Sequence, residues 1–263
     1  MNGRIPQSIQ FDSVADLYDL YVRTDFDIPF WLDQTRSISG KVLELTCGTG
    51  RVSIPLLKAG VNLSCVDYAP EMLAQFRKKL AEQGLTCPVY CQDVVHLNIP
   101  DRFDLIFIPF HSFSEITQRQ RQRLALTRIH SHLTSQGRFV CTLQNPVVRT
   151  SSIDGTERLI GEFPLPDGGI LRVSARMTFD PSTHVASGEQ VYEQLSPEKV
   201  CLDRRVLEVN FYLFDKHEFE SLLADTGFSV EALYGDYDRH PFEDATSPFM
   251  IWNLRRSATE RND

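Results

Sequence analysis

Short apolar runs alternate with stretches of helical periodicity from residue 41 onward. Five of these runs have the length of buried strands: 42–45, 63–66, 89–92, 105–110 and 139–143. Three intervening segments place apolar residues every three to four positions, as amphipathic helices do: 52–59, 70–83 and 118–133. Strands that alternate with helices in this way pair in parallel through right-handed crossovers. The pattern therefore predicts an α/β sheet covered by helices on both faces.

The alternation of predicted strands and helices stops after residue 145. Three segments with alternating or β-branched residues, separated by turn-forming residues, predict antiparallel strands: 171–178, 186–194 and 204–214. The α/β pattern resumes with a helix at 216–226 and strands at 228–234 and 249–254. We therefore expect a core of residues 1–145 and 215–256, an antiparallel insert at 146–214 and a disordered tail at 257–263.

The composition and charge of the chain indicate which classes of protein and partner are expected. Hydrophobic residues make up 42% of the 263 residues and charged residues 24%, which is ordinary for a globular protein. A net charge of −8 repels phosphate backbones, so we expect no nucleic-acid partner. The sequence shows no signal-peptide pattern and no apolar run long enough to span a membrane. Its six scattered cysteines lack zinc-site spacing, and we expect a cytoplasmic protein with reduced thiols and no metal site.

The stretch that is most informative about chemistry joins the first strand to the first helix. Gly48 and Gly50 form a Gly-x-Gly turn, which lets the backbone approach a ligand and exposes the N–H groups of a helix N-terminus. Dinucleotide-binding enzymes use such a turn too, but they favour a third glycine where this chain has Ser53. Glu44 precedes the turn, and its negative charge suits a ligand with an ammonium and a sulfonium better than a pyrophosphate.

Acidic residues also follow the next two strands. Asp67 ends the second strand, where a carboxylate can accept paired hydrogen bonds from a ribose diol. Its alternative role is to cap the helix that Pro70 opens. Asp93 closes the third strand, where an adenine amino group would lie, and a solvated turn residue is the alternative there.

In order and spacing, these motifs resemble those of class I S-adenosylmethionine (SAM)-dependent methyltransferases: Glu44-Leu-Thr-Cys-Gly-Thr-Gly50, Val66-Asp67, Gln92-Asp93-Val94 and Phe103-Asp104. The resemblance covers residues 11–145 and 212–255. It implies a Rossmann-like, seven-stranded, mostly parallel sheet with a reversed last strand and with SAM across the strand ends. It also implies which residues bind the cofactor: Tyr18, Trp31, Glu44, Thr46, Cys47, Gly48, Thr49, Gly50, Asp67, Tyr68, Met72, Gln92, Asp93, Val94, Pro109 and Phe110.

The N-terminal segment carries a helical pattern rich in aromatic residues. Its residues 11–19 resemble the lid helix of glycine-type and amino-sugar N-methyltransferases. The resemblance implies that Tyr18 contacts the methionine part of SAM, and that Tyr21, Phe30 and Trp31 shape the pocket. Packing of these rings against the sheet is the alternative.

Polar residues at strand ends are candidates for contact with the methyl acceptor. His111 follows the fourth strand, which in this family ends beside the transferable methyl, and an imidazole can accept a proton near neutral pH. Gln144 and Asn145 follow the fifth strand and complete the catalytic candidates. The expected pocket residues are Tyr21, Ser112, Phe113, Tyr237 and His240.

The predicted function is transfer of a methyl group from SAM to a small molecule, at nitrogen rather than at oxygen or carbon. An amine needs only to lose a proton near neutral pH, which suits a site without an evident strong base. O- or C-methylation is the first alternative, followed by an NAD(P)-dependent oxidoreductase and a non-catalytic SAM-binding protein. The insert either covers the acceptor pocket or joins two copies in a homodimer.

Overall fold

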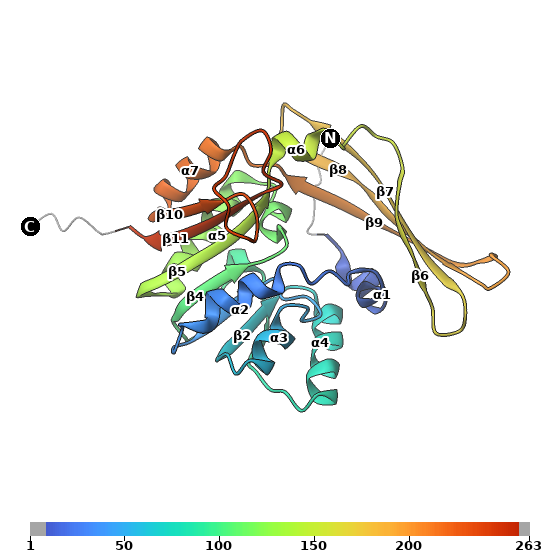
Figure 1. Cartoon of the computed structure of the whole chain (residues 1–263), viewed down its shortest axis with the longest axis horizontal. Helices are drawn as coiled ribbons and strands as arrows, with labels where there is room; N and C mark the ends of the chain where they lie inside the picture. Colours follow the sequence, from blue (N-terminus) through green and yellow to red (C-terminus); the bar gives the residue numbers. More distant parts are fainter. Residues whose placement is uncertain (1–8, 258–263) are drawn as a thin grey trace, which may run out of the picture.

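The computed structural model describes residues 9–257 and contains a seven-stranded sheet at its centre (Figure 1). The strand order across this sheet is β10 (Phe228–Tyr234), β11 (Phe249–Arg256), β5 (Leu133–Gln144), β4 (Phe103–Ile108), β1 (Val42–Leu45), β2 (Leu63–Asp67) and β3 (Val89–Cys91). Strands β1 to β5 pair in parallel, whereas β11 runs antiparallel to both of its neighbours. The predicted fold class, with its reversed last strand, is confirmed.

Helices cover both faces of the sheet because strand side chains alternate between two apolar clusters. Leu43 and Ile106 point toward one face, which packs against α5 (Arg119–His132) and α7 (Lys216–Asp225). Val42 and Leu105 point toward the other face. That face is covered by α2 (Ile28–Arg36), α3 (Ser53–Lys58) and α4 (Pro70–Glu82).

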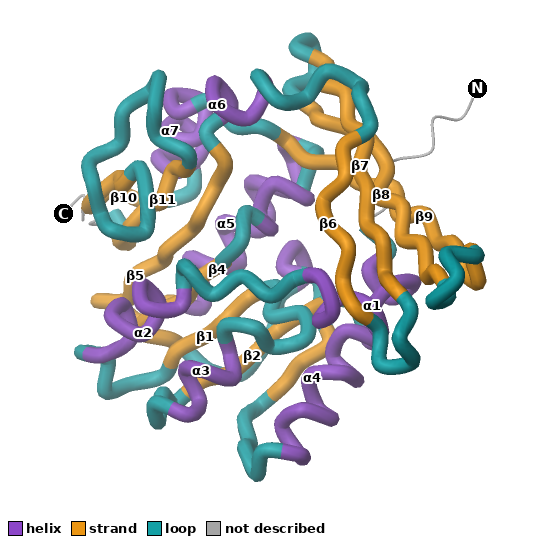
Figure 2. The backbone as a smooth tube through the Cα atoms, turned by 45° about the vertical axis from the view of Figure 1, so that its right-hand side comes forward, coloured by secondary structure: helices purple, strands orange, loops and turns teal. Residues whose placement is uncertain are grey.

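The insert forms a second sheet of four antiparallel strands in the order β6 (Arg158–Pro164), β7 (Ile170–Asp180), β8 (Val185–Leu195) and β9 (Cys201–Tyr212). It follows a short helix, α6 (Pro146–Thr150). Its inner face packs against η1 (Phe11–Val14) and α1 (Ala15–Tyr21) through Val14 and Leu17. Figure 2 shows this sheet as a wall beside α1 and the edge of the main sheet.

Some predicted boundaries are wrong, and β6 was not predicted. Leu159 and Ile160 of this edge strand are both exposed, so β6 lacks the alternation of buried and polar positions by which strands are recognised. The fourth strand ends at Ile108 rather than at residue 110, because Phe110 and His111 adopt positive φ angles of 55° and 65°. Residues 258–263 of the predicted tail lie outside the described residues.

Two short helical turns complete the elements near the carboxyl ends of the parallel strands. They are η2 (Val94–His96), directly after β3, and η3 (Ser112–Glu115), directly after β4. Within residues 9–257, no helix is long and apolar enough to cross a membrane.

Candidate cofactor and acceptor site

The turn between β1 and α3 places two glycines in different surroundings. Both have positive φ, 54° at Gly48 and 85° at Gly50. A β-carbon on Gly50 would lie 2.2 Å from the buried ring of Phe76, whereas one on Gly48 would meet only the terminal methyl of Met72, at 3.3 Å. Gly50 is therefore required for packing against α4, and Gly48 is the position where a ligand can approach the backbone.

Asp67, at the end of β2, is hydrogen-bonded to this turn. Its Oδ2 accepts a hydrogen bond from the backbone N–H of Gly48 at 2.7 Å, and its Oδ1 accepts one from Ala69 at 2.9 Å. Burial raises the pKa of the carboxyl, against the lowering effect of these bonds. Each carboxylate oxygen can accept more than one hydrogen bond, so both retain capacity for the two hydroxyls of a ribose.

Glu44 lies beneath the turn and is almost completely buried. Its Oε2 accepts a hydrogen bond of 2.6 Å from Ser53, the residue at the position where dinucleotide-binding proteins have a third glycine. Burial raises the pKa of Glu44 to about 8, although the Ser53 bond and the charge of Arg51 oppose the shift. A cation bound nearby would favour the ionised form.

Glu115, in η3, is a site residue that the sequence analysis missed. Burial and the negative charge of Asp67 raise the pKa of its carboxyl to about 8, against hydrogen bonds with Ser112 and Tyr68. Nothing in the local sequence marks a glutamate that follows Ser112-Phe-Ser as a buried acid. Its position depends on the tight turn after β4.

The residues predicted to bind adenine are placed at the end of β3, where each also has a local structural role. Asp93 caps η2 by accepting from the N–H of Val95 at 2.9 Å, and it pairs with Arg121 at 2.6 Å. Gln92 exchanges two hydrogen bonds with the backbone of Asn98. Val94 is buried in the core cluster. Their contacts to a cofactor stay predictions.

Helix α1 is attached to the cofactor turn. The hydroxyl of Thr49 donates to Asp19 at 2.6 Å, and Lys79 of α4 pairs with the same carboxylate. Arg51 reaches the linker that follows α1, where it donates to both oxygens of the buried Asp27. These bonds hold the N-terminal segment over the turn, as expected of a lid.

The aromatic residues of the predicted lid divide into two groups. Tyr18 and Tyr21 line a cavity, with their rings packed edge to face at 5.5 Å. Trp31 instead lies in the core, where it stacks on Phe107 at 4.6 Å and donates its Nε1–H to Asp27. The interpretation of Trp31 as a cofactor contact is therefore not supported, and the alternative of packing on the sheet describes it.

The cavity has a volume of about 550 Å³ and lies between the end of β4, the lid and the insert. It brings together six residues predicted from sequence: Tyr18, Tyr21, Phe110, His111, Ser112 and Gln144. The inner face of the insert contributes Ala175, Met177, Gln190, Val209 and Phe211. Phe113 does not reach the cavity, because its ring is fully buried against Phe214 and Phe219.

His111 follows the end of β4 and has a strained backbone conformation. Thr46, Phe110 and His111 all combine a side chain with positive φ, a conformation that costs free energy and is concentrated at functional sites. The imidazole stacks on Phe249 at 5.1 Å, and its Nδ1 is buried without a hydrogen-bond partner. Burial lowers the pKa of His111 to about 4, so the ring is neutral at physiological pH.

Three other candidates are directed away from the cavity or are fully engaged. The amide of Asn145 accepts from Val147 and donates to the carbonyls of Asp244 and Ser247, both at 2.8 Å. The side-chain nitrogen thus holds the loop between β10 and β11 and the oxygen caps α6, and Asn145 is not among the residues that line the cavity. Tyr237 packs against Phe26, Phe30 and Phe249 rather than lining the cavity.

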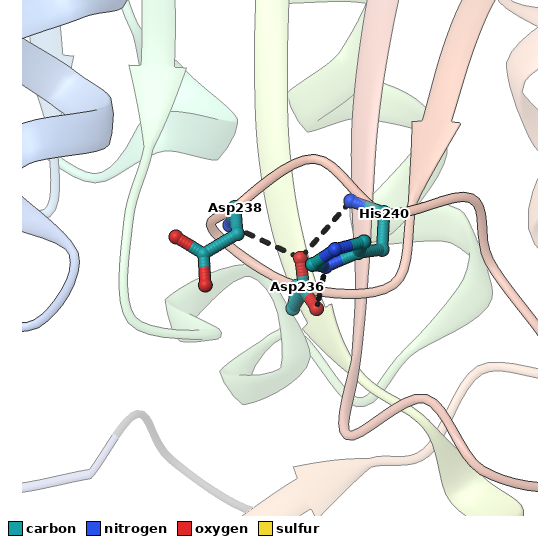
Figure 3. Close-up of side chains that lie close together, drawn as sticks. All are labelled: Asp236, Asp238 and His240. Atoms are coloured by element: carbon teal, nitrogen blue, oxygen red, sulfur yellow. Dashed lines mark hydrogen bonds and ion pairs between the residues drawn. The ribbon is translucent and has the colours of Figure 1, made fainter.

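His240 lies in the same loop and is largely exposed (Figure 3). Its ring contacts Asp236 at 2.8 Å, and the backbone N–H groups of Asp238 and His240 donate to the other oxygen of that carboxylate. This arrangement shapes a surface turn. The prediction that His240 lines the acceptor pocket is therefore not supported.

Comparisons with known proteins agree with this geometry. Residues 42–137 match a family described as "Methyltransferase domain". The glycine/sarcosine/dimethylglycine N-methyltransferase of Actinopolyspora halophila is 27% identical over 240 residues, 89% of this chain and 39% of that protein. The chain thus spans about two-fifths of the length of this curated relative. Ribosomal-RNA methyltransferases also match, over 27% of the chain.

Two solved structures share the fold over nearly the whole chain. An S-adenosylmethionine-dependent methyltransferase from Clostridium acetobutylicum superposes with a TM-score of 0.78 at 19% identity, covering 94% of this chain and 99% of that one. The sugar N-methyltransferase KedS8 from Streptoalloteichus has a TM-score of 0.74 at 18% identity and covers 98% of each chain.

The glycine turn and its acidic neighbours lie together at the carboxyl edge of the parallel strands, which makes them the candidate cofactor site. Residues 42–137 match a methyltransferase domain, and the chain as a whole shares the fold of SAM-dependent methyltransferases. The residues present fit SAM, because the open side of Gly48, the buried carboxyls of Glu44 and Asp67 and the partly buried carboxyl of Glu115 suit a ligand with a diol and two cationic groups.

Proposed function

We propose that the protein transfers the methyl group of SAM to an amine nitrogen of a small molecule. The observation that carries the proposal is the neutral imidazole of His111, whose buried Nδ1 has no partner and which lines the cavity at the end of β4. The names of the Actinopolyspora relative and of KedS8, both N-methyltransferases, support the choice of nitrogen.

The proposal also assigns a role to each part of the cofactor turn. Gly48, with Thr46, Cys47 and Thr49, would hold the methionine part, and Glu44 would balance its ammonium. Asp67 would accept hydrogen bonds from the ribose, and Gln92, Asp93 and Val94 would flank the adenine. When bound, SAM supplies an electrophilic methyl on a sulfonium. The lid, through Tyr18, would exclude water from that group.

The acceptor residues orient the nucleophile. The imidazole of His111 lines the cavity, where it can accept a hydrogen bond from an amine N–H and leave the nitrogen lone pair to point at the methyl group for in-line displacement. Gln144 lines the same cavity and offers an amide for a further polar contact.

The insert would cover the acceptor pocket. Residues from α6 and from all four strands of the insert line the cavity, which supports this role over that of a contact between two copies. All six cysteines are unpaired, which supports the proposed cytoplasmic location, where thiols stay reduced.

Methyl transfer can be tested by following S-adenosylhomocysteine formation with a panel of small amines, alcohols and activated carbons. We expect turnover with amines and a mass gain of one methyl group on the product. Turnover with alcohols or carbon nucleophiles alone would overturn N-methylation, and product formation that requires NAD(P) instead of SAM would overturn the whole class.

A further inference from the structure

The cavity is lined by a partly buried positive charge that the proposed methyl transfer does not use. Arg149, in α6, lines the cavity and is partly buried. Its guanidinium donates to the Ser152 hydroxyl at 3.0 Å and to the Met177 sulfur at 3.5 Å. Both partners are neutral, and no carboxylate of residues 9–257 pairs with Arg149 as an ion pair within 4.0 Å.

The surroundings of Arg149 increase the local positive charge rather than balance it. Burial, together with the charge of Arg158, lowers the pKa of Arg149. Arg158 has its own partner in Asp154. Arg23 also lines the cavity, and the sole acidic residue there, Glu115, has a pKa raised to about 8 and is mostly uncharged at neutral pH.

A guanidinium that is partly removed from water without an anion is unfavourable, and a bound anion would satisfy it. Arg149 and His111 line the same cavity, and the charge of Arg149 contributes to the lowered pKa of His111. An acceptor held by both groups would therefore carry an anion close to its nucleophilic nitrogen.

We propose that Arg149 binds a carboxylate of the methyl acceptor, so that the substrate class is small amino acids rather than neutral amines. This inference rests on the proposed N-methylation. A carboxylate is favoured over a phosphate because Arg149 is the one cavity arginine that is partly buried without a carboxylate partner. The cofactor's own carboxylate is a poor alternative, because Arg149 contacts the insert through Met177, whereas the arginine at the glycine turn is Arg51.

The first test needs no turnover. Acetate should raise the thermal unfolding midpoint of the wild-type protein by about 2 °C in the 100 mM range, relative to chloride at the same ionic strength. The shift should disappear in Arg149→Met and persist in Arg128→Met, which changes an exposed arginine of α5. No difference between acetate and chloride, or an equal shift in Arg149→Met, would overturn the proposal. A shift with inorganic phosphate but not with acetate would overturn the choice of a carboxylate.

The second test compares two acceptors that differ in one group, sarcosine and 2-(methylamino)ethanol. Arg149→Met should raise the KM for sarcosine at least tenfold and leave the KM for the alcohol unchanged, and Arg149→Lys should restore part of the loss. The SAM dissociation constant should stay the same. Equal use of both acceptors by the wild type would overturn the proposal, as would a loss of SAM affinity in Arg149→Met, since the anion would then belong to the cofactor.

The two proposals fail in different ways. If no amine is methylated but the acetate effect depends on Arg149, the proposed N-methylation is wrong and the anion site stands. If amines are methylated and acetate has no effect on stability, the anion site is wrong and the proposed function stands.

Discussion

Binding of SAM should release a proton from Glu44. Burial raises the pKa of this carboxyl to about 8 in the cofactor-free protein, so at pH 7 about nine-tenths of the molecules hold it protonated. A ligand that brings an ammonium and a sulfonium near Glu44 favours the carboxylate and lowers its pKa. If the pKa of Glu44 returns toward its ordinary value of 4.5, about 0.9 proton leaves per SAM bound at pH 7.

The same linkage fixes how SAM affinity depends on pH. Because the free protein binds the proton more tightly than the complex does, affinity rises as pH rises and levels off above the pKa of about 8. Between pH 6 and pH 8 the gain is roughly 50-fold for a bound-state pKa near 4.5. Glu44 makes the stability of the cofactor-free protein depend on pH in the opposite direction. The unfolded chain ionises this carboxyl at a lower pH than the folded protein does, so the free energy of unfolding falls as pH rises from 4.5 to about 8.

Isothermal titration calorimetry in two buffers of different protonation enthalpy measures the released proton. The observed enthalpies should differ in the wild type and converge in Glu44→Gln, and Glu82→Gln, on an exposed position of α4, should behave as the wild type does. Equal enthalpies in the wild type would refute the reasoning. A release that persists in Glu44→Gln would assign the proton to Glu115, the other carboxyl whose pKa is raised to about 8.

Four further predictions concern single positions or the whole surface. Asp67→Ala should weaken SAM binding by roughly 1.5–3 kcal/mol through the lost hydrogen bonds to the ribose, and unchanged calorimetric affinity would remove Asp67 from that site. Gly48→Val should abolish SAM binding with little change in the circular dichroism spectrum. The control Gly60→Ala, at a φ of 81° with open space around it, should still bind SAM. Normal SAM binding by Gly48→Val would mean that this turn does not contact the cofactor. His111→Ala should lower kcat at least about tenfold and leave SAM affinity nearly unchanged, and the reverse pattern would make His111 a cofactor contact. Transfer RNA and duplex DNA should not bind in a filter assay, and tight, salt-sensitive retention would contradict this expectation.

The local pattern of the sequence was sufficient for the elements of the main sheet and for the cofactor turn. Strand and helix periodicity depend on residues a few positions apart, and the motif from Glu44 to Gly50 lies within one strand, turn and helix. Even there, the two glycines looked equivalent. Only the packing of α4 shows that Gly50 makes room for Phe76 while Gly48 stays open.

The acceptor side of the site was decided by tertiary structure. Asn145 looked like a catalytic amide, but its nitrogen donates to Asp244 and Ser247, which lie about one hundred residues away in sequence, and its oxygen caps α6. Trp31 looked like a pocket residue until its partner Phe107 placed it in the core. The burial of a residue depends on all the segments that pack around it, so the local sequence pattern gives little information about it.

Tertiary structure also decided which charged residues belong to the site. The identities of Glu115 and Arg149 are plain in the sequence, yet neither was a candidate, because an acid or an arginine on a short helical turn is usually solvated. The turn after β4 and the wall formed by the insert partly shield both side chains from water. It is this desolvation, arising from contacts between distant segments, that changes an ordinary polar residue into one that needs a ligand.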